Sequence, residues 1–254
     1  SLDIPGDDEL VFYSIVGNTS SEEKLKNLKS YIVKKGVIDE KREENRRIIR
    51  EIEANIATVS SNKNFDSYCA QTFLDNDLRG GVPVVCKTQG RKSIFYLYSR
   101  KHGDLERDYN HFVLEQTYLS QGNSHFRDVN QNRRNDVWFN PLVEDSNIIT
   151  FFNLIQTDGF NPLVVNGLTY TAEDVPALKE WLGKIVKDPE SLSDLLEMVK
   201  KPFPPGEFIM KIEDTGSGIS NYDEIVAAML SFCKANDVGE LHEGYWIDHW
   251  TYNM

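Results

Sequence analysis

Cysteine is scarce in this sequence: Cys69, Cys86 and Cys233 are the only three among 254 residues. They lie far apart and are odd in number, so they match neither a disulfide framework nor the paired spacing of a zinc site. Each is predicted to be a small buried residue, because free cysteine packs as an apolar side chain. This cysteine usage favours a reducing compartment.

Long apolar runs are also missing. No segment approaches the roughly 20 apolar residues that a membrane-spanning helix needs. The N-terminus has no charged and apolar signal-peptide pattern. Together with the few cysteines, these absences predict a cytoplasmic protein without a membrane partner.

Positive charge is in short supply, with 28 Lys and Arg against 40 Asp and Glu, for a net charge of −12. Such a balance argues against nucleic acid as a partner, because binding to phosphates needs a basic surface. Basic residues are nevertheless frequent between residues 24 and 134, where an anionic ligand could bind.

Several catalytic signatures are absent. The position four after His242 is Trp246, which excludes the paired histidines of a zinc protease. No serine lies in a Gly-x-Ser-x-Gly elbow. Residues 215–218 (Thr-Gly-Ser-Gly) lack the lysine of a P-loop and are predicted to be a linker turn. The other histidines show no metal-ligand spacing, so no metal site is predicted.

Most of the elements that the sequence predicts are helices. Apolar residues at helical spacing predict helices over residues 39–59, 65–78, 104–120, 148–155, 172–187, 191–200 and 222–235, with 148–155 buried. Strands are predicted over residues 10–16 and 208–212, and a hairpin over 82–86 and 94–98. Because a lone strand at 10–16 cannot support itself, and the chain stops at Met254 without a helix cap, we expect a piece of a larger polypeptide.

The most distinctive stretch is residues 125–136 (His-Phe-Arg-Asp-Val-Asn-Gln-Asn-Arg-Arg-Asn-Asp). It has too few apolar side chains for a core helix. Its forked donors and acceptors match vicinal hydroxyls, and aromatic residues flank it on both sides. The pattern indicates a carbohydrate site, although a structural lattice of ion pairs would have the same composition.

A second stretch, residues 243–250 (Glu-Gly-Tyr-Trp-Ile-Asp-His-Trp), places Asp248 between two tryptophans. Desolvation by such neighbours raises the pKa of a carboxyl group, which suits a general acid. The alternative is that Asp248 is the N-cap of a helix.

Together the two stretches resemble the β-glucan oligosaccharide phosphorylases of glycoside hydrolase family 94. Residues 126–131 (Phe-Arg-Asp-Val-Asn-Gln) are similar to the family's aromatic-Arg-Asp-x-x-Gln motif. Residues 246–248 (Trp-Ile-Asp) are similar to its Trp-x-Asp motif, in the same order and at a matching separation. Residues 132–141 and 151–165 resemble the long members of the family, the cellobiose or β-oligoglucan phosphorylases.

The resemblance implies a mainly α fold that is part of an (α/α)6 barrel. Residues 1–18 would be the last strand of an N-terminal β-sandwich, residues 19–62 a helical linker, and residues 63–254 the first half of the catalytic barrel. The remainder of the barrel and the family's phosphate-binding positions would lie outside this chain. The fragment alone is therefore expected to be inactive.

The chemistry that the resemblance implies is inverting phosphorolysis of a β-linked gluco-oligosaccharide, preferably a β-1,2-glucan, to α-glucose 1-phosphate. Asp248 would be the general acid and inorganic phosphate the co-substrate, with no metal or organic cofactor and no general base. The resemblance leaves the oligomeric state open between a monomer and a homodimer of the intact protein, since the family is often dimeric. Substrate contacts are expected from Arg127, Asp128, Gln131, Arg133, Arg134 and Trp246.

Two positions depart from the family pattern. Residues 121–124 (Gln-Gly-Asn-Ser) stand where short members have an arginine, and residues 248–251 (Asp-His-Trp-Thr) replace Asp-Trp-Asn-Asp. Both departures concern the acceptor. One rival hypothesis is an inverting glycosidase, which needs a second carboxylate to activate water. The other is a non-catalytic carbohydrate-binding or structural segment, with Asp248 only a cap.

Overall fold

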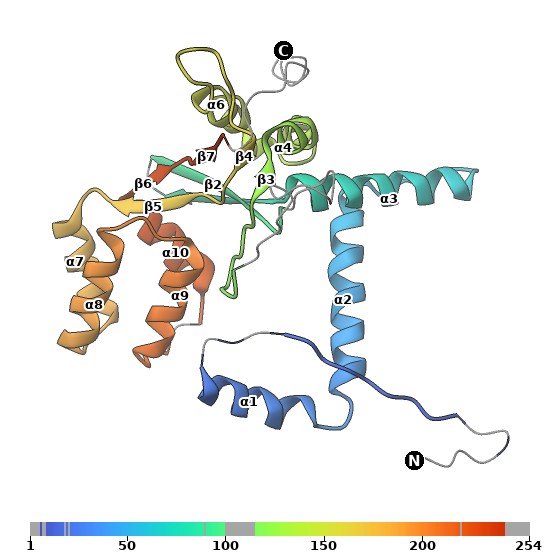
Figure 1. Ribbon diagram of the computed structural model, residues 1–254, viewed down its shortest axis with the longest axis horizontal. Coiled ribbons are helices and arrows are strands. Elements are labelled where there is room, and N and C mark those ends of the chain that lie inside the picture. Colours follow the sequence, from blue (N-terminus) through green and yellow to red (C-terminus); the bar gives the residue numbers. More distant parts are fainter. Residues whose placement is uncertain are drawn as a thin grey trace. The chain divides into compact units, whose positions relative to one another are not determined.

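The computed structural model describes residues 6, 9–17, 19, 21–88, 90–99, 115–218 and 220–241. The chain divides into two units, residues 1–44 and 45–254. Helix is the dominant secondary structure of the described residues and the sheets are small, which confirms the mainly α prediction (Figure 1). The domain boundaries predicted at residues 18 and 62 stay predictions.

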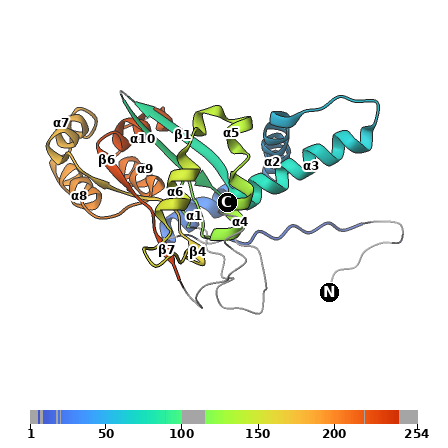
Figure 2. The same cartoon turned by 90° about the horizontal axis from the view of Figure 1, so that it is seen from above.

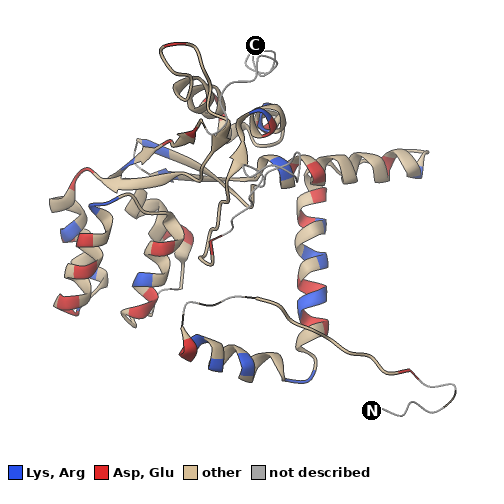
Figure 3. Ribbon diagram, viewed as in Figure 1, with Lys and Arg blue, Asp and Glu red and all other residues tan. Residues whose placement is uncertain are grey.

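The first unit contains an irregular segment over residues 9–17, helix α1 (Glu22–Ile32) and the beginning of helix α2 (Val37–Glu53). Ser21 caps α1, because its hydroxyl accepts a hydrogen bond from the Lys24 backbone N–H at 3.1 Å. Charges of both signs alternate along α2 (Figure 3). They pair within the helix, as Lys41 does with Glu44 at 2.6 Å, and such pairs stabilise a solvated helix.

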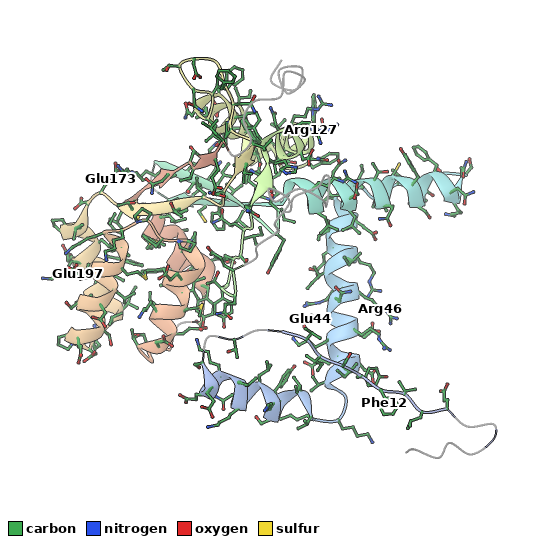
Figure 4. All side chains as sticks on the ribbon, viewed as in Figure 1. Phe12, Glu44, Arg46, Arg127, Glu173 and Glu197 are labelled. Atoms are coloured by element: carbon green, nitrogen blue, oxygen red, sulfur yellow. The ribbon has the colours of Figure 1, made fainter. Side chains whose placement is uncertain are left out.

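The strand predicted over residues 10–16 is wrong. Residues 9–17 have no regular secondary structure, and the Phe12 side chain is 71% exposed (Figure 4). A strand is held by hydrogen bonds to a neighbour, and none of the sheets formed by the described residues includes this segment. The apolar run alone therefore does not make a strand here.

The second unit starts with the end of α2, the 3-10 helix η1 (Ala54–Ile56), helix α3 (Lys63–Gly80) and strands β1 (Val82–Thr88) and β2 (Arg91–Leu97). The side chain of Asn62 caps α3, and Gly81 follows its end at φ 87°, a conformation that favours glycine. β1 and β2 pair antiparallel with Val85 opposite Ile94, which confirms the predicted hairpin.

Short strands connect the later helices of this unit. Two antiparallel sheets form, with the strand orders β3-β4-β7 and β5-β6. The elements in chain order are β3 (Ser124–His125), α4 (Phe126–Arg133), α5 (Asp136–Phe139), η3 (Pro141–Val143), α6 (Ser146–Asn153), β4 (Val164–Val165), β5 (Thr169–Ala172), α7 (Val175–Ile185), α8 (Pro189–Val199), α9 (Pro205–Asp214), α10 (Tyr222–Leu230), β6 (Cys233–Asn236) and β7 (Gly239–Glu240).

The main apolar core lies among α7, α8, α9 and α10, which pack in succession (Figure 1). Figure 2 shows α10 beside β1, so the hairpin covers part of this core. α7 and α8 confirm two predicted helices, and both begin at an aspartate cap, Asp174 and Asp188. The fully buried side chains include Leu178, Leu182, Val199, Phe208 and Met229.

The helix predicted over residues 104–120 is not formed at residues 115–120, and the remainder of it lies outside the described residues. Leu119 has φ 51°, which an α-helix does not accommodate. Gly206 lets the backbone at Tyr118 approach the start of α9 closely, because a Cβ at position 206 would lie 1.6 Å from the Tyr118 carbonyl oxygen. Residues 115–120 therefore form a non-helical turn that packs against the start of α9.

Two further predictions need correction. The strand predicted over residues 208–212 lies within α9, because Phe208, Ile209 and Ile212 form one buried face at helical spacing. The helix predicted over residues 222–235 ends at Leu230, and Cys233 begins β6, which pairs with β5. In both places, packing or pairing with residues distant in the sequence determines the secondary structure.

No helix in the described ranges combines the length and the apolar character that crossing a lipid bilayer requires.

Candidate functional site

Helix α4 carries the arginine-rich stretch and is anchored through its first residues. β3 pairs with β4, and the Phe126 N–H donates to the Leu163 carbonyl at 3.0 Å. Phe126 and Val129 are fully buried, and Phe126 packs edge-on against Phe151 with ring centroids 5.3 Å apart. The prediction that this stretch is not a core helix is thus wrong in part, because two apolar residues at i, i+3 suffice to seat a short helix.

The opposite side of the first turn holds an ionic cluster of three residues, His125, Arg127 and Asp128. Asp128 is only 7% exposed. Its Oδ1 accepts a hydrogen bond from Arg127 Nε at 2.9 Å, and its Oδ2 lies 3.4 Å from His125 Nδ1. Asp128 Oδ2 is buried without a hydrogen-bond partner among the described residues. One carboxylate oxygen is therefore held by arginine, while the other faces the His125 ring at a longer distance.

Asp128 is kept as a carboxylate. Burial alone would raise its pKa, but the neighbouring His125 ring and the Arg127 guanidinium outweigh this effect, so the pKa lies below its ordinary value. Arg127 is partly exposed, with 32% of its side chain accessible, and projects from α4 (Figure 4). The pair offers an ionised acceptor next to a forked donor, the arrangement that binds hydroxyl groups.

Arg133 has a structural role. Its Nε donates to the Gly80 carbonyl at the end of α3, and its guanidinium lies 3.7 Å from the ring centre of Tyr96 on β2. Burial lowers the pKa of Arg133. The side chain, 8% exposed, thus ties α3, β2 and α4 together, as the ion-lattice alternative predicted for such residues.

Two other predicted site residues, Gln131 in α4 and Arg134 directly after it, are exposed and follow Arg127 at i+4 and i+7. Arg134 borders a hollow of about 280 Å³ between α4 and α6. No hydrogen bond or ion pair of Arg134 occurs within the described part of the chain. Helical spacing therefore places these two residues on the same face as Arg127, one and two turns farther along the chain.

Helix α6 confirms the predicted helix near residues 148–155 but not its burial. Phe151 is buried against α4, whereas Ile148 is 64% exposed and Phe152 57% exposed. The apolar side chains of α6 occupy about half of its circumference, and most of them are exposed, while Asn147 on the polar side contacts Tyr96 of β2.

Two carboxyl groups that the sequence did not single out lie close together on α3 and α5. Phe73 and Phe139 pack edge-on with centroids 4.7 Å apart. Asp77 follows Phe73 by one helical turn and Asp136 precedes Phe139 by nearly one, so the ring contact brings the two carboxyls together. Burial raises the pKa of Asp77 to about 7, and repulsion from Asp136 adds to this.

Asp136 is the more buried partner. Burial raises its pKa to about 6, although hydrogen bonding with Tyr96 and Asn147 and the charge of Arg133 act in the other direction. Asn147 also donates to the Tyr96 hydroxyl at 2.8 Å and to the Arg133 carbonyl at 3.1 Å. The signal in the sequence was an aspartate on the apolar face of each helix, but its partner could not be inferred from spacing alone.

Asp248 and Trp246, the predicted acid and its neighbour, lie outside the described residues. Within the described ranges, no cluster of three or more His, Cys, Asp and Glu side chains has the arrangement to hold a metal ion. Comparisons with protein-family models, curated proteins and solved structures found no match to this chain.

Proposed function

We propose that this chain is part of a glycoside phosphorylase that cleaves β-linked gluco-oligosaccharides, preferentially β-1,2-glucans, with inorganic phosphate. The products are α-glucose 1-phosphate and a shortened sugar. The observation that carries the proposal is the Arg127–Asp128 pair, a buried ionised carboxylate that holds a partly exposed guanidinium. A guanidinium fixed in this way offers its remaining N–H donors to sugar hydroxyls.

In this proposal the residue that donates the proton to the glycosidic oxygen is not Asp128. Asp128 cannot serve as the general acid near neutral pH, because its pKa is lowered. In the proposed mechanism Asp248 protonates the glycosidic oxygen, and phosphate attacks the anomeric carbon from the opposite face. Phosphate is already an anion, so no side chain has to activate it. Trp246 would form one wall of the same sugar subsite, with Gln131, Arg133 and Arg134 farther from the reacting bond.

The architecture belongs to the same proposal. Helices α7 to α10 pack successively as antiparallel neighbours, which is compatible with one part of an (α/α)6 barrel. The proposed segments are the end of a β-sandwich at 1–18, a helical linker at 19–62 and the first half of the barrel at 63–254. A cytoplasmic location and a homodimer of the intact protein complete the proposal.

Substitution of the two aspartates tests the mechanism. In the complete polypeptide, Asp248→Asn should lower kcat for phosphorolysis by about 10²–10⁴-fold, because it removes the acid. Asp128→Asn should lower kcat/KM by about 10–100-fold, because it removes a charged hydrogen-bond acceptor. Asp194→Asn, an exposed aspartate on α8, is the matched control and should leave both parameters unchanged. An unchanged rate in the Asp248 variant would contradict the mechanism.

A further inference from the structure

A hollow lies on the other side of the α4 anchor, between the segments 121–123 and 166–169. Its open part has a volume of about 390 Å³, within the range of small-molecule sites. A smaller chamber of about 40 Å³ adjoins it and reaches Arg133 and Tyr96. Gln121, Gly122, Asn166, Gly167 and Leu168 line both spaces and form the wall between them. We refer to the open part of about 390 Å³ as the recess.

The recess is a built feature of the fold. The Gln121 side chain donates to the Leu168 carbonyl at 2.8 Å and accepts from the Leu168 N–H at 2.8 Å. This pair of hydrogen bonds joins the two segments in the way that paired backbone groups join neighbouring strands. Gly167 permits the close approach, because a Cβ there would lie 2.9 Å from the Cβ of Gln121. Asn166 is fixed in turn by donating to Glu240 at 2.6 Å.

The lining of the open part is mostly uncharged and has a polar side and an apolar side. Amide side chains and glycine backbone line one side, and Leu168, Pro202, Pro204 and Val238 provide apolar surface. Among the lining residues that the structure describes, Glu115 is the only charged one, and none is a lysine or arginine. An anion would find no counter-charge in this part of the recess. A pyranose, with a hydroxyl rim and apolar C–H faces, matches such a lining.

We infer that this recess is a subsite for the neutral sugar chain, binding glucose units distant from the cleaved bond. The inference rests on the proposed function, in which the reacting unit is held by Arg127 and Asp128. It also gives a role to residues 121–124, which stand where short members of the family have an arginine. An uncharged Gln-Gly-Asn-Ser segment suits an extended neutral acceptor better than a charged group would.

Binding to this 254-residue chain tests the subsite directly, because all of its described lining residues fall within 115–238. We would titrate β-1,2- and β-1,4-linked glucobiose and glucotetraose, and glucose 1-phosphate, into isotopically labelled chain. For one linkage, the tetraose should bind about tenfold more tightly than the biose and shift the amide signals of Gly167 and Leu168. Glucose 1-phosphate should leave these two signals in place.

A blocking variant tests the same subsite by filling it. Val238 is 42% exposed at the wall, so Val238→Trp should occupy the space without breaking a hydrogen bond. We expect it to weaken tetraose binding about tenfold, while Val59→Trp, at a 92% exposed valine elsewhere, should have no effect. Asn123→Ala is the second variant, and it should weaken tetraose binding because it removes an amide from the lining without adding bulk.

The outcomes separate the subsite from the proposed function. If the complete polypeptide phosphorolyses gluco-oligosaccharides but Val238→Trp leaves KM unchanged for biose and tetraose alike, the subsite is wrong and the function stands. If no phosphorolysis occurs but the tetraose still shifts Gly167 and Leu168, the subsite stands and the function is wrong. Equal affinity for biose and tetraose, with neither signal shifted, overturns the subsite.

Discussion

Replacing Arg133 by alanine is expected to lower the free energy of unfolding by about 3 kcal/mol. The substitution removes a buried charged donor from the Gly80 carbonyl and leaves that acceptor unsatisfied. It also removes the contact of the guanidinium and its apolar stem with Tyr96. Losses of this size follow when one partner of a buried ionic arrangement is deleted. Denaturant unfolding followed by far-ultraviolet circular dichroism would measure the change.

The adjacent arginine provides the control for this prediction. Arg134 is exposed and forms no hydrogen bond or ion pair with the residues that the structure describes. Arg134→Ala should therefore change the free energy of unfolding by less than about 0.5 kcal/mol. Equal effects of the two substitutions would contradict the assignment of Arg133 as the residue that joins α3, β2 and α4.

Converting Asp77 and Asp136 together to asparagine is expected to stabilise the protein at pH 8 and to change little at pH 4. The pKa values of these carboxyls are raised to about 7 and about 6 in the folded chain. Because the folded state binds these protons more tightly than the unfolded state, their contribution to stability is present below pH 4. It is lost as the pH rises through 6 and 7.

The expected gain from the double substitution at pH 8 is about 2–3 kcal/mol. Raised pKa values of this size correspond to a larger figure, but both side chains keep partial contact with solvent, which reduces it. Thermal unfolding at several pH values, with Asp194→Asn as an exposed control, would measure the effect. A double variant whose advantage over the parent protein is the same at pH 4 and pH 8 would show that the two carboxyls do not titrate as inferred.

Local signals in the sequence predicted the parts of the fold that depend on local contacts. α7 and α8 each have an aspartate cap and one apolar face, and the hairpin follows from two apolar runs around a glycine. The predictions at residues 10–16 and 208–212 failed because a short apolar run does not distinguish a strand from a helix or an unpaired segment. Whether such a run pairs depends on residues far away in the sequence.

The candidate site was predictable to a similar extent. Composition singled out Arg127, Asp128 and Arg133, but spacing could not show that the first two form a pair while Arg133 is held by Gly80 and Tyr96. Gln121 was noted only as a departure from a family pattern, and its clamp on Leu168 depends on a contact 47 residues away. Side-chain roles in this chain are thus set by packing between distant segments.

Phosphate dependence is the most direct test of the proposed function. The complete polypeptide would be incubated with β-1,2-, β-1,3- and β-1,4-linked gluco-oligosaccharides, with and without inorganic phosphate, and glucose 1-phosphate would be assayed. We predict glucose 1-phosphate from one linkage, preferentially β-1,2, and only when phosphate is present. Release of free glucose without phosphate would identify a hydrolase instead, and no product from any linkage would contradict the proposal.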